Sequence, residues 1–458
     1  MNAVYLSPAF CSANGVLITG IDEKRVSFGM LHPEDTALQA RIKKEYAEYL
    51  CVFTVIPPEE FNLKLSQLYA EENPDENAVQ SNGGEDSRAS VIDKIADDAP
   101  VINLLNSIFL EALAKKASDI HIESGKEHTR LRFRIDGILV FIRIIPTERA
   151  LAVSARLKLL ANLNVLENRR PQDGHIDISA EAYSLDVRIS ITPTIWGESI
   201  VLRLLNRSDV PLSIGALGFS AGYQASISAI LSMASGLVLV TGPTGSGKTT
   251  TLAALLQELN KTALKIISIE DPVEYRIEGI TQIQVNEELD LTFDAALRRI
   301  FRQDPDIIMV GEIRDTETAE LAIRAALTGH LVFATLHTNN APESIYRLQN
   351  MGIPFYMVAA VLRASIAQRL IRKKCTACNA AGCSVCAGTG YAGRTVIAEI
   401  LVMTTVLADL ISRGIQAEEL RRTLEQGGHR TLFDDAEEKV RAGITTGEEI
   451  KRELGVPL

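Results

Sequence analysis

The sequence predicts an α/β protein whose main part is a mostly parallel sheet with helices on both faces. From about residue 217 onward, apolar runs of strand length alternate with helical stretches, a pattern typical of strand–helix–strand units. The apolar run at 237–240 leads directly into a glycine-rich loop and a further helix. This order is the usual setting of a phosphate-binding loop. The expected strands are residues 237–241, 265–270, 307–310 and 331–336.

Two smaller parts precede this sheet. Residues 1–70 combine short apolar stretches with a helical stretch at 33–49, which predicts a small α/β module. Further along, residues 130–137 alternate strictly between charged and apolar side chains, which indicates a strand with one buried face. Helical periodicity at 101–114 and 150–163 accompanies this strand. The second part is therefore expected to be an α+β domain.

A polar, acidic segment lies between these two parts. Residues 71–90 contain almost no side chain that could be buried, so we expect a flexible linker. The expected division is a docking module at 1–70, a linker at 71–97, an α+β domain at 98–215 and the main α/β domain at 216–458.

The composition limits the classes of partner. Of the 458 residues, 47 are Lys or Arg and 58 are Asp or Glu, so the net charge is −11. Domains that bind nucleic acid usually carry a basic face, and this balance argues against a nucleic-acid motor. No apolar run approaches the roughly 18 residues that span a bilayer, and the amino terminus lacks a secretory signal pattern. A cytoplasmic location is expected.

The glycine-rich loop has the spacing G-x-x-x-x-G-K-[ST] of a phosphate loop. Its glycines let backbone N–H groups approach phosphate oxygens, and the following helix adds its dipole. Lys248 is expected to reach the β- and γ-phosphates of a nucleoside triphosphate, and Thr249 to hold Mg²⁺. A chance match is the alternative, which the flanking strand and helix disfavour. The candidate nucleotide-binding residues are Gly242, Pro243, Thr244, Gly245, Ser246, Gly247, Lys248, Thr249 and Thr250.

Carboxylates follow two of the expected strands, at the sheet edge where open α/β proteins bind ligands. Glu270, Asp271 and Glu274 end one strand and begin its loop. Glu312 follows the strand at 307–310, as in a Walker B element, where a carboxylate is directed toward Mg²⁺ and orients the attacking water. The alternatives are a solvated acidic loop for the first group and a surface acid for Glu312.

Two histidines bracket the strand at 331–336. His337 is expected at the same edge as the carboxylates, where a sensor of the γ-phosphate would lie, and His330 precedes the strand. A structural role is the alternative for either histidine.

Four of the six cysteines fall within twelve residues, as Cys375-x₂-Cys378-x₄-Cys383-x₂-Cys386. Two paired C-x-x-C segments can present four thiolates tetrahedrally to Zn²⁺. Disulfides are the alternative, which a reducing cytoplasm disfavours. We expect a small structural zinc knuckle at 375–386, because four sulfur ligands leave no open position for water.

These motifs together resemble the secretion ATPases that drive type II secretion and type IV pilus assembly. The resemblance covers roughly residues 98–458, about three quarters of the chain. Besides the phosphate loop, it includes SDIHIE at 118–123, RFRIDG at 132–137, PQDG at 171–174, the Asp box IEDPVE at 269–274, the Walker B segment DPDIIMVGEIRD at 304–315 and the His box at 328–338. The paired cysteines resemble those of assembly-type members, although the spacer between the pairs is shorter than usual.

The resemblance implies a RecA-like ATPase domain, a preceding PAS-like α+β domain and a homohexameric ring that hydrolyses ATP with Mg²⁺. By matching position, Glu274 and Glu312 would serve Mg²⁺ and water, and His330 and His337 would form the His box. Arg188 and Arg203 match the family's arginine fingers, which act on a neighbour's nucleotide. The alternative for these arginines is the charged outer face of a strand.

The resemblance also implies the partners. An inner-membrane platform protein would receive the motion, and the cytoplasmic part of a membrane docking protein would bind the amino-terminal module. The ring would then lie at the inner membrane through its partners alone, extruding pilin or pseudopilin subunits. Two alternatives are a nucleotide-gated scaffold with little turnover and a conjugation-type ring that moves DNA.

Overall fold

The computed structural model describes residues 11, 15–22, 25–31, 36–46, 49–57, 61, 64, 99–180, 183–206 and 213–455. The expected linker at 71–97 lies wholly outside these residues. The chain forms two compact units, one built mainly from residues before 204 and the other mainly from residues 204 onward. Among the described helices, none combines the length and the apolar character needed to cross a membrane.

The amino-terminal module is a three-stranded sheet with one helix described beside it. Strand β2 pairs antiparallel with β1 and parallel with β3. The described core of this module includes Leu17, Phe28 and Met30 from the sheet and Ile42 from the helix. Helix α2 lies inside the predicted helical stretch at 33–49, and the bounds of the elements are β1 Val16–Asp22, β2 Arg25–Met30, α2 Thr36–Glu45 and β3 Leu50–Val55.

The α+β part contains a six-stranded sheet in the order β6-β5-β4-β9-β8-β7. The predicted alternation holds on β5, where Leu131 and Phe133 are buried and the alternating residues Arg130, Arg132 and Arg134 are not. Helix α6 runs three residues earlier than the sequence predicts, because Asn162 has a positive φ of 55° that ends helical geometry. The bounds are α5 Ala99–Ala114, β4 Ala117–Ser124, β5 Thr129–Ile135, β6 Ile138–Ile145, α6 Thr147–Leu160, β7 Gln172–Ala180, β8 Tyr183–Thr194 and β9 Gly197–Asn206.

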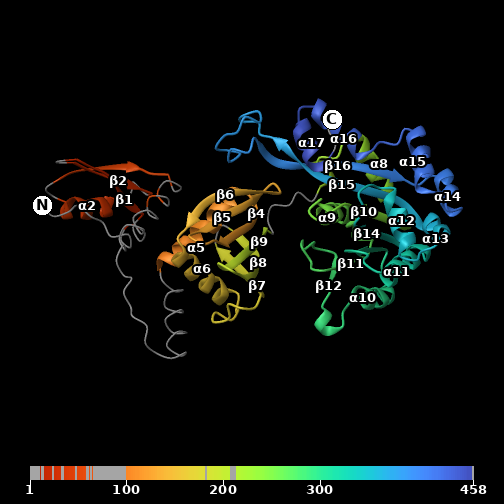
Figure 1. Ribbon diagram of the computed structural model, residues 1–458, viewed down its shortest axis with the longest axis horizontal. Coiled ribbons are helices and arrows are strands. Elements are labelled where there is room, and N and C mark those ends of the chain that lie inside the picture. Colours follow the sequence, from red (N-terminus) through yellow and green to blue (C-terminus); the bar gives the residue numbers. More distant parts are fainter. Residues whose placement is uncertain are drawn as a thin grey trace. The chain divides into compact units, whose positions relative to one another are not determined.

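The second unit is built on a seven-stranded sheet in the order β12-β11-β13-β14-β10-β15-β16 (Figure 1). All neighbouring strands are parallel except β15 and β16, which confirms the mostly parallel sheet. The four predicted strands are present as β10, β11, β13 and β14. The bounds are β10 Gly236–Thr241, β11 Ile266–Glu270, β12 Thr281–Gln284, β13 Ile307–Val310, β14 Leu331–Leu336, β15 Leu362–Lys374 and β16 Tyr391–Val402.

Two hydrophobic cores cover the two faces of this sheet, because successive strand side chains point to opposite faces. Leu237 and Leu239 of β10 belong to the core shared with α10 to α16, whereas Val238 and Val240 belong to the core shared with α8 and α9. Every residue of β10, β11, β13 and β14 is buried, which explains why these strands read as continuous apolar runs.

The helices of this unit fall into a set that connects the strands and a set that follows the sheet. The connecting elements are α7 Ile214–Leu217, α8 Ala221–Leu231, α9 Lys248–Leu259, η1 Glu287–Leu289, α10 Phe293–Ile300, η2 Phe301–Gln303, α11 Thr316–Leu327, α12 Glu343–Asn350 and α13 Phe355–Val361. The following helices are α14 Thr405–Ser412, α15 Ala417–Gln426, α16 Leu432–Arg441 and α17 Gly447–Leu454.

Candidate functional site

The phosphate loop joins the end of β10 to the start of α9. Gly247, the residue that precedes α9, has a φ of 87°, a conformation that glycine adopts at little cost. At Gly242 a Cβ atom would lie 2.5 Å from the carbonyl oxygen of Gln368 and 2.6 Å from Ser246 Oγ. The loop is therefore closed against β15 in a way that excludes a side chain at this glycine. Such a loop at the start of a twelve-residue helix fits a nucleotide's phosphate chain.

Lys248 lies folded over this loop. Its Nζ donates to the carbonyl oxygens of Gly242 at 2.8 Å and Pro243 at 3.1 Å. Burial lowers the pKa of Lys248, and the negative charge of Glu312 acts in the opposite direction. Lys248 follows β10 and Glu312 follows β13, and both strands pair in parallel with β14, so the two predicted groups open at the same edge of the sheet.

Glu312 stands on the loop after β13, held between two basic side chains. His337 Nε2 lies 3.0 Å from Glu312 Oε1, and Arg314 Nε donates to Glu312 Oε2 at 2.9 Å. Arg314 Nη1 also lies 3.6 Å from Asp271 Oδ2, so it connects the Walker B and Asp-box carboxylates. The hydrogen bond to Glu312 is the main cause that raises the pKa of Arg314.

The backbone around Glu312 is fixed by both neighbouring strands. Gly311 N–H donates to Ile269 O at 2.8 Å, and Ile313 N–H donates to Thr335 O at 3.0 Å. Thr335 Oγ1 donates in turn to Gly311 O at 2.6 Å. The loop after β13 is thus tied to the ends of β11 and β14, which directs Glu312 toward the sheet's carboxyl edge.

The Asp-box carboxylates lie in different environments. Glu270 is 5% exposed and accepts hydrogen bonds from Ser268 Oγ and Gln282 Nε2. Burial is the main cause that raises its pKa. Asp271 and Glu274 are exposed. Tyr275, the residue after Glu274, contacts the start of α9, because its OH lies 3.2 Å from Thr250 Oγ1. Glu270 therefore holds the end of β11, whereas Asp271 and Glu274 are placed to meet a ligand.

The two His-box histidines lie at opposite ends of β14. His337 follows the strand and contacts Glu312, whereas His330 precedes it, about 20 Å away at strand geometry. His330 Nδ1 donates to Ala325 O at 2.9 Å, and its ring lies 6.0 Å from that of Phe301. The structure therefore brings His337 beside Glu312 and places His330 at the amino edge of the sheet, next to Ala325 and Phe301.

Two residues that sequence reasoning missed support the site. Arg314 connects two predicted carboxylates, and the signal for it was its place two residues after Glu312. Thr338 Oγ1 donates to Thr241 Oγ1 at 2.9 Å, so the loop after His337 is tied to the residue that precedes the phosphate loop. A single threonine in this position carries no recognisable pattern in one sequence.

The two candidate arginine fingers lie on adjacent strands of the six-stranded sheet. The two-residue turn Ile195–Trp196 joins β8 to β9, and counting back from the turn aligns Arg188 with Arg203. The Arg203 side chain is 62% exposed, and its Nε lies 3.1 Å from Oδ1 of the buried Asp119 on β4. Asp119 stands directly opposite Arg203 in the ladder, so it fixes the direction of the guanidinium.

The four cysteines of residues 375–386 come together as one cluster. Sγ separations are 3.8 Å for Cys375 and Cys383, and 3.7 Å for both Cys378 and Cys383 from Cys386. Ligands about 2.3 Å from one tetrahedral Zn²⁺ would be about 3.8 Å apart, whereas a disulfide needs about 2.05 Å. Backbone N–H groups of Gly382, Cys383 and Gly390 donate to these sulfurs. The donor set and its spacing fit zinc.

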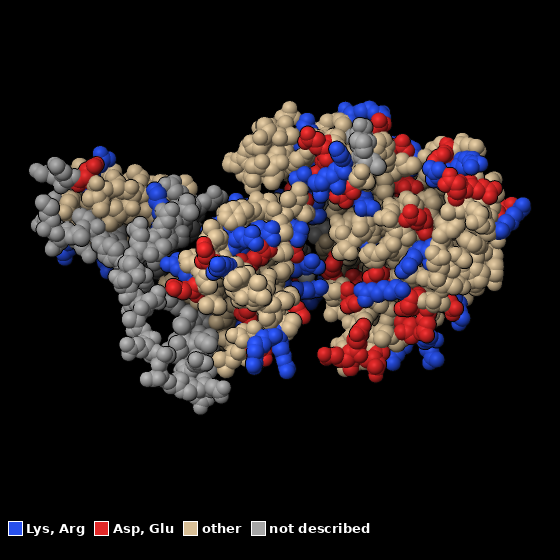
Figure 2. Space-filling view, in the orientation of Figure 1, with Lys and Arg blue, Asp and Glu red and all other residues tan. Residues whose placement is uncertain are grey.

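The knuckle extends from the ends of β15 and β16 (Figure 1). Residues 375–390 contain no charged side chain, and Figure 2 shows this projection in the uncharged colour. Val385, within this projection, is 73% exposed.

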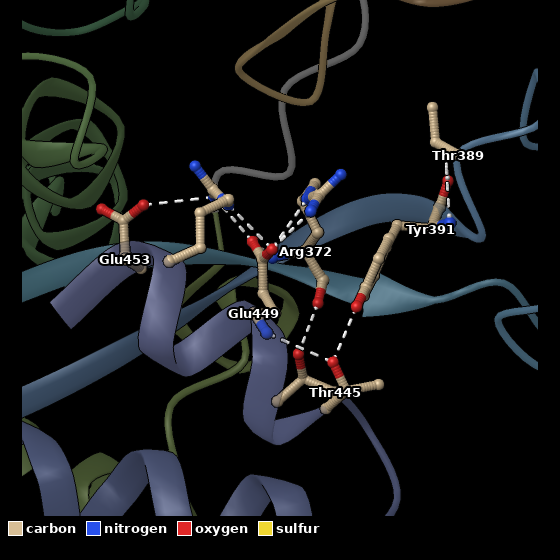
Figure 3. Close-up of polar contacts among 8 residues, drawn as sticks. Arg372, Thr389, Tyr391, Thr445, Glu449 and Glu453 are labelled. Carbon is tan, nitrogen blue, oxygen red and sulfur yellow. Dashed lines mark hydrogen bonds and ion pairs between the residues drawn. The ribbon is translucent and has the colours of Figure 1, made fainter. Parts of the chain in front are cut away.

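A buried ion-pair network attaches the base of the knuckle, the end of β15 and the start of β16, to α17 (Figure 3). Glu449 is 1% exposed and accepts hydrogen bonds from Arg372 on β15 and from Arg452 one turn further along α17. The Arg372 guanidinium also lies 4.0 Å from the centre of the Tyr391 ring. Tyr391 OH contacts Thr446 Oγ1 at 2.6 Å. Both strand ends that carry the cysteines are thereby attached to the C-terminal helix.

Known proteins match most of the chain. Residues 94–452 match the family described as Type II/IV secretion system protein, and residues 2–75 match the MshEN domain. Type II secretion system protein HxcR of Pseudomonas aeruginosa is 44% identical, with 78% of each chain covered. Type II secretion system protein E of Dickeya dadantii is 37% identical, with 97% of this chain and 96% of that protein covered. Type IV pilus assembly ATPase PilB of Myxococcus xanthus is 41% identical, with 84% of this chain and 75% of that protein covered.

Solved structures agree with the fold. The pilus retraction motor PilT with bound ADP has a TM-score of 0.55 at 30% identity, covering 75% of this chain and 95% of that one. The ATPase DotB of Legionella pneumophila has a TM-score of 0.62 at 23% identity, covering 76% of this chain and 94% of that one, and supports the fold alone. With one family spanning residues 94–452 and relatives at 37–44% identity over most of its length, the chain belongs to the type II/IV secretion system protein family.

Proposed function

We propose that this protein is an ATP-hydrolysing motor that powers the assembly or extrusion of pilin or pseudopilin subunits in type II secretion or type IV pilus biogenesis. The observation that carries the proposal is the position of Glu312. This carboxylate lies between His337 and Arg314, at the sheet edge onto which the phosphate loop also opens. The groups proposed to bind phosphate and to orient water would therefore act at one sheet edge.

Each group has a distinct part in hydrolysis. Lys248 and the loop N–H groups compensate the charge of the phosphate chain, and Glu312 orients water for attack on the γ-phosphorus. His337 donates to Glu312 and keeps one carboxylate oxygen fixed. Mg²⁺, held by Thr249 with the exposed carboxylates Asp271 and Glu274, would neutralise charge as the phosphoryl group leaves.

The proposed working form is a homohexamer. Arg188 and Arg203 lie in the α+β domain, outside the sheet that carries the phosphate loop, and would act on the nucleotide of a neighbouring subunit. Support for this role comes from the exposure of Arg203 and its alignment by Asp119. A guanidinium placed at the γ-phosphate stabilises the transition-state charge.

The knuckle and the amino-terminal module would serve assembly. Zinc held by Cys375, Cys378, Cys383 and Cys386 would fold the knuckle, an uncharged projection suited to docking. The module at 1–70 would bind the cytoplasmic part of a membrane docking protein, and the motor would act on an inner-membrane platform protein. The protein would therefore be cytoplasmic and reach the inner membrane through its partners.

A steady-state ATPase assay on the full-length protein, over a range of protein concentrations and with or without double-stranded DNA, tests this function. We expect turnover that rises with protein concentration as rings assemble and does not respond to DNA. The matched Lys248→Ala variant should lose nucleotide binding and turnover together. Nucleotide binding with negligible turnover would favour the scaffold, and DNA-stimulated turnover would favour the DNA-moving ring.

A further inference from the structure

Gln368 is a buried polar residue of β15 that the nucleotide chemistry described above leaves unused. Its neighbour Ala367 pairs with Thr241, the last residue of β10, so β15 continues alongside the phosphate loop where β10 ends. Gln368 is 1% exposed, and its carbonyl oxygen is the atom that leaves no room for a side chain at Gly242. Both its backbone and its side chain therefore lie against the loop.

The side chain makes one hydrogen bond, and that bond reaches the loop. Gln368 Nε2 donates to the carbonyl oxygen of Ser246 at 2.8 Å. Because the acceptor is a carbonyl, the nitrogen end of the amide must face it. Among the described residues, Gln368 Oε1 and Ser246 Oγ are both buried without a hydrogen-bond partner. The amide thus uses its donor on the loop and leaves its acceptor unpaired, an arrangement unlike that of a buried glutamine that only completes a core.

This hydrogen bond also sets the direction of a backbone donor, the Gly247 N–H, because the Ser246–Gly247 peptide group is planar. The Ser246–Gly247 peptide is trans, so its C=O and N–H point in opposite directions within one plane. With the Ser246 carbonyl held toward β15, the Gly247 N–H is held away from β15. Gly247 is the residue just before α9, where backbone N–H groups bind phosphate oxygens.

We propose that Gln368 is a positioning residue of the nucleotide site, which fixes the Ser246–Gly247 peptide so that the Gly247 N–H meets the phosphate chain of ATP or ADP. The inference rests on the nucleotide site proposed above. The next residue, Arg369, donates to Asn339 Oδ1 at 3.0 Å, two residues after His337. Strand β15 therefore supports the phosphate loop and the loop of His337 from adjacent positions.

The test measures ADP affinity by calorimetry in the full-length protein and its Gln368→Met variant, which keeps the side-chain length and removes the donor. Loss of one aligned donor to a charged phosphate is expected to weaken ADP binding by about tenfold. The KM for ATP should rise by a similar factor while kcat changes little, because ADP already carries the phosphates that the Gly247 N–H would meet, and these are not transferred. ADP binding can be read even if the parent shows no turnover, so failure of the motor function is distinguished from failure of this inference.

The matched control is Ser365→Ala, since Ser365 is a buried polar residue of the same strand whose hydroxyl pairs with Ser344 on α12. This variant should lower the melting temperature and leave ADP affinity unchanged. Gln368→Asn, which keeps an amide but is one methylene too short to reach Ser246, should weaken ADP binding as Gln368→Met does. Parental ADP affinity in either folded Gln368 variant, or an equal loss in Ser365→Ala, overturns the proposal.

Discussion

Glu312 Oε1 and His337 Nε2 lie 3.0 Å apart, although 24 residues separate them and each follows a different strand. The pairing is possible because β13 and β14 are adjacent and parallel, so their carboxyl ends open at the same edge. Gly311 and Ile313 are hydrogen-bonded to the strands on either side, which removes the freedom of the loop between them. A carboxylate held in this way is suited to aligning a water molecule, whereas a surface acid that only contacts solvent needs no such fixed position.

Replacing Glu312 by Gln should lower kcat for ATP by at least about 10²-fold while nucleotide affinity stays close to that of the parent. The amide keeps the size of the side chain but cannot accept a proton from water. The measurement is single-turnover hydrolysis beside ADP binding. The control is Glu317→Gln at an exposed ion pair with Arg298, which should leave both unchanged. Parental turnover in the Glu312 variant would show that another group orients the water.

The order of strands and motifs was enough to predict this edge of the sheet. Buried parallel strands read as continuous apolar runs, so β10, β11, β13 and β14 were predicted with their carboxyl ends in place, and the residues after them followed. His330 shows the limit of that reasoning. Its position beside His337 in one motif suggests a shared site, but the extended strand between them carries them to opposite edges. Only the direction of β14 decides which histidine lies beside Glu312.

Contacts between distant segments were beyond the reach of a single sequence. Gln368 and Glu449 contact partners on other elements, and the pairing of Gln368 with Ser246 spans 122 residues. No local periodicity encodes such a contact. The cysteine cluster was predictable because its four ligands are close in sequence and their chemistry fixes the spacing.

The double variant Arg188→Ala, Arg203→Ala should lower kcat by about 10³-fold and spare ADP affinity more than Lys248→Ala does. The guanidinium groups would stabilise charge that develops only in the transition state, so ground-state binding depends on them little. Steady-state hydrolysis and ADP calorimetry on the same preparations provide the comparison. Arg130→Ala, an exposed arginine of β5, serves as control. Full activity of the double variant, or full activity of a diluted monomer, would contradict action across subunits.

Freshly purified, reduced protein should contain about one zinc per chain. Four thiolates 3.7–3.8 Å apart satisfy one tetrahedral ion, and structural zinc contributes directly to folding free energy. Cys378→Ser should release the metal and lower the melting temperature, while Cys51→Ser, outside the cluster, should keep it. Less than about half an equivalent by metal analysis, with all four thiols freely titratable, would exclude the zinc knuckle.

The ion pairs of Glu449 predict a stability difference that depends on pH. Burial alone would raise the pKa of Glu449, but hydrogen bonds from Arg452 and Arg372 outweigh it and lower the pKa from 4.5 to about 2. A carboxyl whose pKa is lower in the folded chain stabilises that chain fully above the unfolded pKa, and the contribution is lost as the pH falls from about 4.5 toward 2. Breaking such a buried pair from one side costs about 3–5 kcal/mol.

Glu449→Gln should therefore unfold at a clearly lower temperature than the parent at pH 7, and the gap should narrow as the pH falls below about 4.5. The Gln side chain keeps its shape but leaves Arg372 without a counter-charge, and protonation of Glu449 does the same to the parent. Thermal unfolding of both proteins between pH 7 and about pH 3 measures the gap. Glu418→Gln, at an exposed pair with Arg421, should show little difference at any pH, since exposed ion pairs contribute little. If the gap for Glu449→Gln is constant down to about pH 3, the buried network stabilises the base of the knuckle by shape rather than by charge.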